Sequence, residues 1–181
     1  MIVVGQLSKY VEEKAGASAM VPIHMSDAND AQVVESQVSL IQACKTKGVP
    51  MILVAMEIFM PSQPPYTVQS GVEDSNIIQR LGSEASGGRC YSVTQKTGNV
   101  FADTDLETKI KSFGRWQIIL AGGMADACVK ATAVGAPGVP QEVTNGAVDR
   151  GFIVHTTSDV ILGDLGTWPD TAPNVRCYTR Y

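Results

Sequence analysis

The stretch WQIILAGGMADACVKATA, residues 116–133, holds the clearest strand-to-helix unit of the chain. Its first part, WQIILAG (116–122), is an apolar run of the kind found in strands covered on both faces. GMADACVKATA then leads through a tight glycine turn into a helix. A buried strand followed at once by a helix is the unit from which parallel sheets are built, so this stretch predicts an α/β protein.

Further strands and helices alternate on both sides of this unit. VPMILVAM (49–56) and GFIVHTTSD (151–159) predict two more strands. Apolar residues at helical spacing predict a helix over 33–45. Thr104, in the S/T-x-x-E pattern of a capping box, is the predicted N-cap of a helix that Gly114 closes. Together these elements predict a single-domain three-layer α/β/α sandwich with a mainly parallel, Rossmann-like sheet.

The composition is that of a folded, soluble domain. Of the 181 residues, 44% are hydrophobic and 18% charged, which predicts one domain over 1–181 rather than a disordered chain. Residues 1–16 are a possible N-terminal extension, and 160–181 form an atypical C-terminal segment in which only NVRCYTRY resembles a strand. The net charge of −4 argues against nucleic-acid binding. No membrane span or signal peptide is recognisable, so we expect a cytoplasmic protein.

Neither the histidines nor the cysteines are spaced like metal ligands. The two histidines, His24 and His155, belong to no H-x-H or H-x-x-x-H pair. The sequence therefore predicts no metal site. The four cysteines lie far apart, without a C-x-x-C pair, at Cys44, Cys90, Cys128 and Cys177.

Cys128 is the candidate nucleophile. It follows the strand 116–121 by a few residues and is predicted in the first turn of the next helix, with Asp126 as a plausible N-cap. Ligands of parallel sheets bind at the carboxyl ends of the strands. Free N–H groups and the positive end of the helix dipole favour a thiolate there and can receive an oxyanion. The alternative is a small, buried, inert cysteine.

Residues 93–133 resemble the isochorismatase-like cysteine hydrolase family. That family shows a lysine, a short loop ending in an aromatic residue, a T-D-L helix start, an apolar strand and a G-x-x-x-x-x-C-V-x-x-T turn. In this sequence they correspond to Lys96, Phe101, Thr104 to Leu106, WQIILAG and Gly122 to Thr132. GAVDRGFIVHTTSD (146–159) and KTKGVPMILVAM are similar to two further elements, so the resemblance covers about two thirds of the chain.

The resemblance implies roles for the residues around Cys128. Cys128 becomes the nucleophile and Lys96 the cation that stabilises its thiolate. A cis peptide bond, common in the family at this place, would fall at Gly123–Met124 and turn the N–H of Met124 toward that of Cys128, so that both form an oxyanion hole. The nicotinamidase branch binds a metal through an Asp/His cluster, and no matching D-x-H occurs here.

The third member of the family's triad differs in this sequence. The family's first strand carries an Asp, and the aligned stretch AMVPIHMS (19–26) has His24 in that place. Neutral His24 could act as the base for Cys128, Asp27 could take the role if the strand ends early, or the site is inactive and His24 is only a partly buried histidine. Pro22 lacks the N–H that a central strand needs, which predicts a bent, edge-like or misaligned strand.

The resemblance implies a cofactor-free cysteine hydrolase that cleaves an amide or carbamoyl C–N bond of a small molecule through a thioester on Cys128. Phe59 and Phe101 are candidates for the wall of the substrate pocket. Two alternatives stay open: a vinyl-ether hydrolase of the isochorismatase type, which does not require the cysteine, and an inactive relative that binds a small molecule or a protein. A missing final helix, together with the family's frequent oligomerisation, predicts a homo-oligomer.

Overall fold

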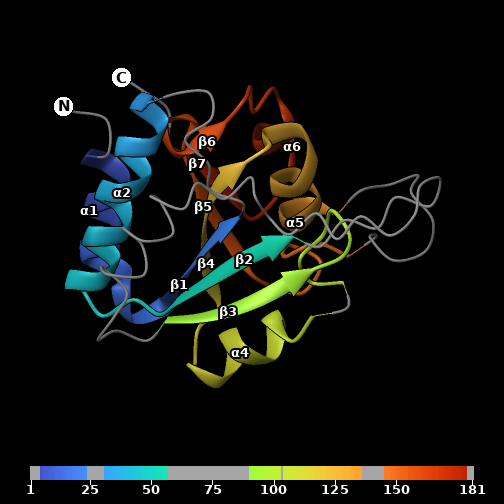
Figure 1. The fold of residues 1–181 in the computed structure, drawn as a ribbon, viewed down its shortest axis with the longest axis horizontal. Coiled ribbons are helices and arrows are strands. Elements are labelled where there is room, and N and C mark those ends of the chain that lie inside the picture. Colours follow the sequence, from blue (N-terminus) through green and yellow to red (C-terminus); the bar gives the residue numbers. More distant parts are fainter. Residues whose placement is uncertain (1–4, 24–30, 57–89, 103, 136–144, 179–181) are drawn as a thin grey trace.

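The centre of the protein is one sheet of parallel strands (Figure 1). The computed structural model describes residues 5–23, 31–56, 90–102, 104–135 and 145–178. Within these residues the strand order is β3-β2-β1-β4-β5-β7, and the short β6 pairs with the end of β4. The strands are β1 (Ser18–Ile23), β2 (Met51–Met56), β3 (Cys90–Gln95), β4 (Gln117–Gly123), β5 (Ile153–Thr156), β6 (Ile161–Leu162) and β7 (Val175–Cys177).

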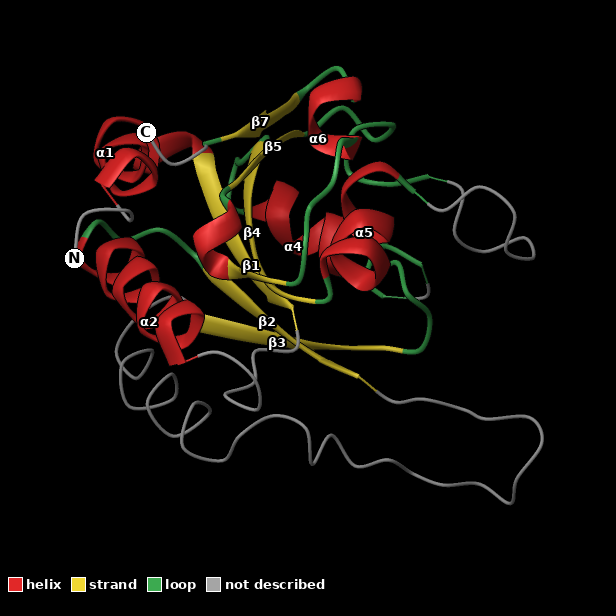
Figure 2. Cartoon of the chain, turned by 90° about the horizontal axis from the view of Figure 1, so that it is seen from above, coloured by secondary structure: helices red, strands yellow, loops and turns green. Residues whose placement is uncertain are grey.

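Helices cover both faces of this sheet, which gives three layers (Figures 1 and 2). α1 (Gly5–Lys14) and α2 (Ala31–Thr46) pack against each other on one face, and α4 (Leu106–Ser112) lies on the other. The helix predicted over 33–45 is confirmed as α2. The strand of the central unit is confirmed as β4, and the two strands predicted on either side of it are confirmed as β2 and β5. The protein is therefore an α/β sandwich with a parallel sheet, as predicted.

The face of α2 that meets the rest of the molecule contains one polar side chain. Val34, Val38 and Ile41 are buried on this face, and Gln37 is fully buried among them. The Gln37 Nε2 donates to the carbonyl of Val160 at 2.9 Å. A buried amide is tolerated where it makes such a bond, so the glutamine links α2 to the turn that follows β5.

β1 is a central strand, which corrects the expectation of an edge-like or misaligned strand from Pro22. β1 pairs with β4 over its whole length, Ser18–Ile23. With β2 it pairs at Met20 and Ile23, and the two residues between them are not paired with β2. The Met20 N–H reaches the carbonyl of Pro50 at 2.8 Å. Since alternate N–H groups of a parallel strand face the same neighbour, Pro22 occupies the position whose N–H would next face β2. The interruption is confined to that side.

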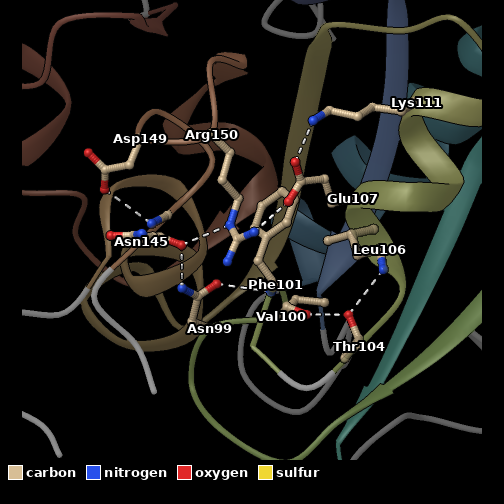
Figure 3. A network of polar contacts seen from close by, with 11 residues as sticks. Asn99, Val100, Phe101, Thr104, Leu106, Glu107, Lys111, Asn145, Asp149 and Arg150 are labelled. Atoms are coloured by element: carbon tan, nitrogen blue, oxygen red, sulfur yellow. Dashed lines mark hydrogen bonds and ion pairs between the residues drawn. The ribbon is translucent and has the colours of Figure 1, made fainter. Parts of the chain in front are cut away.

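α4 begins one residue later than the capping box indicates. Its first residue is Leu106, preceded by Asp105 rather than by the predicted N-cap Thr104. The Thr104 hydroxyl still accepts the Leu106 N–H at 3.2 Å, so one free N–H of the first turn is satisfied. The Glu107 carboxylate does not turn back to cap the helix, because it pairs with Lys111 and Arg150 (Figure 3).

The segment after β5 contains little helix. It forms β6, the one-turn helix α6 (Trp168–Thr171) and then β7, which pairs with β5 at the end of the sheet. β7 lies within the stretch that was predicted to be the last strand. Among the described residues, no helix combines the length and the apolar character needed to cross a membrane.

A polar cluster joins α1 to the amino ends of the central strands. The Tyr10 hydroxyl contacts Ser18 Oγ at 2.8 Å and donates to the side-chain oxygen of Gln117. The same oxygen lies 3.1 Å from Nε2 of His155, and Nδ1 of His155 lies 2.9 Å from the Tyr178 hydroxyl. The rings of Tyr10 and His155 stack with centroids 3.9 Å apart. An oxygen acceptor at Nε2 and a hydroxyl at Nδ1 suit the neutral imidazole, so the cluster favours uncharged His155.

We expect His155 to make the stability of the protein depend on pH. Burial, with a smaller effect of Arg176, lowers the pKa of His155 from 6.5 to about 4. Because the unfolded chain binds this proton more readily, the contribution is complete above pH 6.5 and is lost as the pH falls toward 4, by about 3 kcal/mol in total. Urea unfolding at a series of pH values measures this loss.

The control for this expectation is His155→Gln. This variant lowers stability at every pH, but between pH 6.5 and 5 its free energy of unfolding should change much less than that of the wild type. Equal slopes in the two proteins would show that His155 is not the group responsible.

Candidate active site

The carboxyl end of β4 lies unusually close to β1. Gly122 has φ +113°, and a Cβ at this position would lie 1.7 Å from the carbonyl oxygen of Ile23. No other residue fits there, because any side chain would overlap the neighbouring backbone. The glycine thus lets β1 and β4 end side by side, at the edge where parallel sheets bind ligands.

The chain leaves β4 through a turn that carries Cys128. The peptide bond between Gly123 and Met124 is cis, as the sequence resemblance implied. Ala125–Val129 then form a wide turn of π-helical type, in which Ala127 departs from helical angles. α5 (Lys130–Val134) follows and lies beyond the carboxyl ends of β2 and β3 (Figure 1).

This geometry corrects one expectation about the start of the helix. Asp126 is not the N-cap, since Met124 precedes the segment and no side chain caps it. Ala127 departs from helical angles and its carbonyl accepts the Lys130 N–H, so Cys128 lies directly after this kink, at the start of the helical turn that continues into α5.

The Cys128 thiol is partly buried and contacts a glutamine. Gln95, the last residue of β3, directs its Nε2 at the Cys128 sulfur over 3.5 Å. Gln95 is fully buried, whereas Cys128 keeps some exposure. The two residues come from segments far apart in the sequence, and the sequence analysis did not single out Gln95.

Burial raises the pKa of the Cys128 thiol above its ordinary value. The hydrogen bond from Gln95 and the backbone N–H of Cys128 itself act in the opposite direction, but less strongly. Burial thus disfavours the thiolate of Cys128. A nucleophile of this kind needs a base to take its proton during the reaction.

Lys96 directly follows the last residue of β3 and is exposed. Within the strand, Val93 and Gln95 are buried while Thr94 is exposed, as the alternation of a β-strand requires. In the part of the chain that the structure describes, no hydrogen bond joins Lys96 to Cys128, and the Gln95 carboxamide is beside the thiol. The role of Lys96 as the cation next to the thiolate stays a prediction.

The loop after β3 is fastened to α5. The Val100 N–H donates to the hydroxyl of Thr132 at 3.1 Å, and the Thr132 carbonyl accepts the Ala147 N–H at 2.8 Å. Asn99 adds a bond from its Nδ2 to the Asn145 carbonyl at 3.0 Å (Figure 3). Thr132, one turn after Cys128, thus connects the turn of the candidate nucleophile with the loop that follows Gln95.

Phe101 is buried under a charged side chain. Its ring stacks with that of Phe152 at a centroid distance of 5.7 Å. The Arg150 guanidinium lies 5.1 Å from the Phe101 centroid, and Figure 3 shows it between the Asn145 carbonyl and the Glu107 carboxylate. These contacts give Phe101 a packing role, and its part in a substrate pocket stays a prediction.

The cysteine turn, the cis peptide bond and the parallel sheet lie within one recognisable sequence domain. The isochorismatase domain matches residues 18–162, which is most of the chain. The chain belongs to the isochorismatase family. α1 precedes the matched region, and α6 and β7 follow it.

Several solved structures are similar to this fold. Nicotinamidase from Bacillus subtilis is 19% identical, with a TM-score of 0.64 over 81% of this chain and 87% of that one. N-carbamoylsarcosine amidase from Thermoplasma acidophilum is 18% identical, with a TM-score of 0.63 over 91% and 95%. A putative family hydrolase from Chromobacterium violaceum is 17% identical, with a TM-score of 0.64 over 92% and 89%. No curated protein sequence matches the chain.

Three predicted site residues of this family member, His24, Asp27 and Phe59, lie outside the described residues. Their proposed roles as base, alternative base and pocket wall are therefore untested. The described residues contain no group of three or more His, Cys, Asp and Glu side chains able to share a metal ion.

Proposed function

We propose that this isochorismatase-family protein hydrolyses a C–N bond of a small amide or carbamoyl compound, with Cys128 as the nucleophile. The placement of Cys128 carries the proposal: the thiol is partly exposed, follows the turn from β4 and contacts Gln95. Two of the structural neighbours are amidases by name, a nicotinamidase and an N-carbamoylsarcosine amidase, and this supports the bond class.

In the proposed reaction the Cys128 thiol loses its proton to a base as its sulfur bonds to the carbonyl carbon of the substrate. His24 is the proposed base and Asp27 the second choice. The raised pKa of Cys128 gives the base its purpose, because burial disfavours a thiolate that forms without one. The C–N bond then breaks and the amine leaves with the proton from the base. Water hydrolyses the thioester or thiocarbamate, which gives the carboxylic or carbamic acid and restores the thiol.

The developing oxyanion needs hydrogen-bond donors close to the attacking sulfur. We assign this role to the backbone N–H groups of Met124 and Cys128, which belong to the turn after β4. Fixed backbone donors are effective because they need no rearrangement as the charge develops. The proposed acid–base and oxyanion chemistry therefore uses only side chains and backbone of this chain.

The experiment that tests this function is capture of the thioester. The protein is mixed with nicotinamide, with N-carbamoylsarcosine or with the general acyl donor 4-nitrophenyl acetate, stopped in acid and examined by peptide mass spectrometry. We expect an acyl or carbamoyl adduct on Cys128 and not on Cys177, which is also a free, partly buried cysteine. Equal adducts on both residues, or none with any of the three reagents, would refute the proposal.

A second candidate is an inactive family member that binds a small molecule. The exposed position of Lys96 and the raised pKa of Cys128 favour it, because neither feature activates a nucleophile. Nicotinamide would then raise the melting temperature of the protein without forming an adduct on Cys128.

A further inference from the structure

The Gln95 carboxamide is buried with one of its two polar ends unused. Its Nε2 donates to the Cys128 sulfur at 3.5 Å. Its Oε1 is buried and has no hydrogen-bond partner among the residues that the structure describes. Buried carbonyl oxygens almost always accept a hydrogen bond, since an acceptor removed from water without a donor is destabilised. Because Gln95 Oε1 lies in the carboxamide that contacts the Cys128 sulfur, an N–H group of a bound ligand could donate a hydrogen bond to it.

The surroundings of Gln95 keep this carboxamide in place. Gln95 lies opposite Met56 in the ladder between β2 and β3. The loop that follows it is tied to α5 by the hydrogen bond from Val100 to Thr132. With the backbone held on both sides and Nε2 on the sulfur, Oε1 keeps a fixed direction relative to Cys128.

We propose that Gln95 recognises the N–H of the substrate's amide: Nε2 orients the Cys128 sulfur, and Oε1 accepts a hydrogen bond from the nitrogen of the bond that is cleaved. The inference rests on the proposed function, since it takes Cys128 as the atom to which an amide is brought. It makes Gln95 a specificity-determining residue for the reaction.

The chemical class of substrate follows from the character of Oε1. A carboxamide oxygen only accepts hydrogen bonds, so it favours a substrate nitrogen that carries hydrogen. Unsubstituted and singly substituted amides and carbamoyl groups meet this condition, whereas esters and N,N-disubstituted amides do not. A site built to bond an N–H discriminates against the analogue without it, because its own acceptor then stays unpaired.

The test uses two alkylating reagents, one with an N–H group on its carbonyl and one without. Iodoacetamide carries an amino group on its carbonyl, and methyl iodoacetate carries a methoxy group. With either reagent the sulfur bonds to the methylene carbon, iodide leaves with the electron pair of the C–I bond, and the thiol proton passes to the buffer. Peptide mass spectrometry follows labelling of Cys128 and of Cys177, the partly buried free cysteine of β7. For each reagent, dividing the labelling rate of Cys128 by that of Cys177 removes the difference in intrinsic reactivity between the two reagents.

We expect the Cys128-to-Cys177 labelling ratio to be about three- to tenfold higher with iodoacetamide than with methyl iodoacetate, the effect of one hydrogen bond. In Gln95→Met, which keeps the length of the side chain but removes the acceptor, the two reagents should give the same ratio. Gln37→Met is the matched control. Gln37 is equally buried and its Oε1 is also unpartnered, but its Nε2 donates to Val160.

Equal ratios for the two reagents in the wild-type protein would overturn the inference, and this measurement does not depend on whether a variant folds. A preference that Gln95→Met retains would overturn it as well. Because alkylation of Cys128 needs no hydrolysis, this test can refute the role of Gln95 without refuting the hydrolase function, and the reverse also holds. An amide preference without a thioester adduct would support the role of Gln95 and refute the hydrolase. An adduct without the preference would do the reverse.

Discussion

Cys128→Ser is expected to lower amide hydrolysis by at least roughly a thousandfold. The exchange replaces one atom, so the fold should stay intact. The hydroxyl that replaces the sulfur is a much weaker nucleophile than a thiol under the same conditions. The rate is measured on whichever amide gives the thioester adduct, and thermal unfolding of the variant verifies that its structure is retained.

The matched control for this variant is Cys177→Ser. Cys177 is also a free, partly buried thiol whose pKa burial raises, and it lies in β7. We expect it to keep most of the wild-type rate. Amide hydrolysis that survives in Cys128→Ser would contradict the proposed mechanism.

Gly122→Ala is expected to reduce the free energy of unfolding by about 4 kcal/mol or more. The added Cβ would lie 1.7 Å from the Ile23 carbonyl oxygen, so β1 and β4 must separate at their carboxyl ends. The backbone angle φ of +113° adds a further cost for any residue other than glycine. Urea unfolding at pH 7 measures the loss, and failure to obtain soluble protein is its extreme form.

Gly114→Ala separates these two causes. Gly114 also has a positive φ, +67°, but a Cβ there would meet nothing within 4 Å. We expect this variant to lose only about 1 kcal/mol, the cost of the backbone angle alone. If both variants lost the same amount, the close approach of β1 and β4 would not be the reason for the glycine at 122.

The central part of the fold could be predicted because burial on both faces leaves long apolar runs in the sequence. VPMILVAM and WQIILAG are such runs, and they became β2 and β4. The start of α4 was predicted to within one residue, since the Thr104 hydroxyl does accept an N–H of the first turn. The position of β1 was misjudged, because a proline affects only the neighbour that its N–H would have faced.

The candidate site was predictable only in part. Cys128 and the cis bond before Met124 followed from a motif in adjacent residues. Gln95 was missed because β3, CYSVTQ, has no apolar run and was not recognised as a strand. Had it been, alternation would have placed Gln95 on the same face as Val93. The raised pKa of Cys128 depends on burial by distant segments, which no local pattern reports.

The parallel ladder at the centre of the sheet has a consequence for the nascent chain. Ser18 of β1 pairs with Gln117 of β4, and no hairpin can bring such strands together. Until β4 has emerged from the ribosome, β1 can pair only with β2, and that pairing is interrupted at Pro22. Contacts that span so much sequence form slowly, and unpaired apolar strands aggregate while they wait. Any fragment that ends before Gly123 should therefore depend on chaperones to stay in solution.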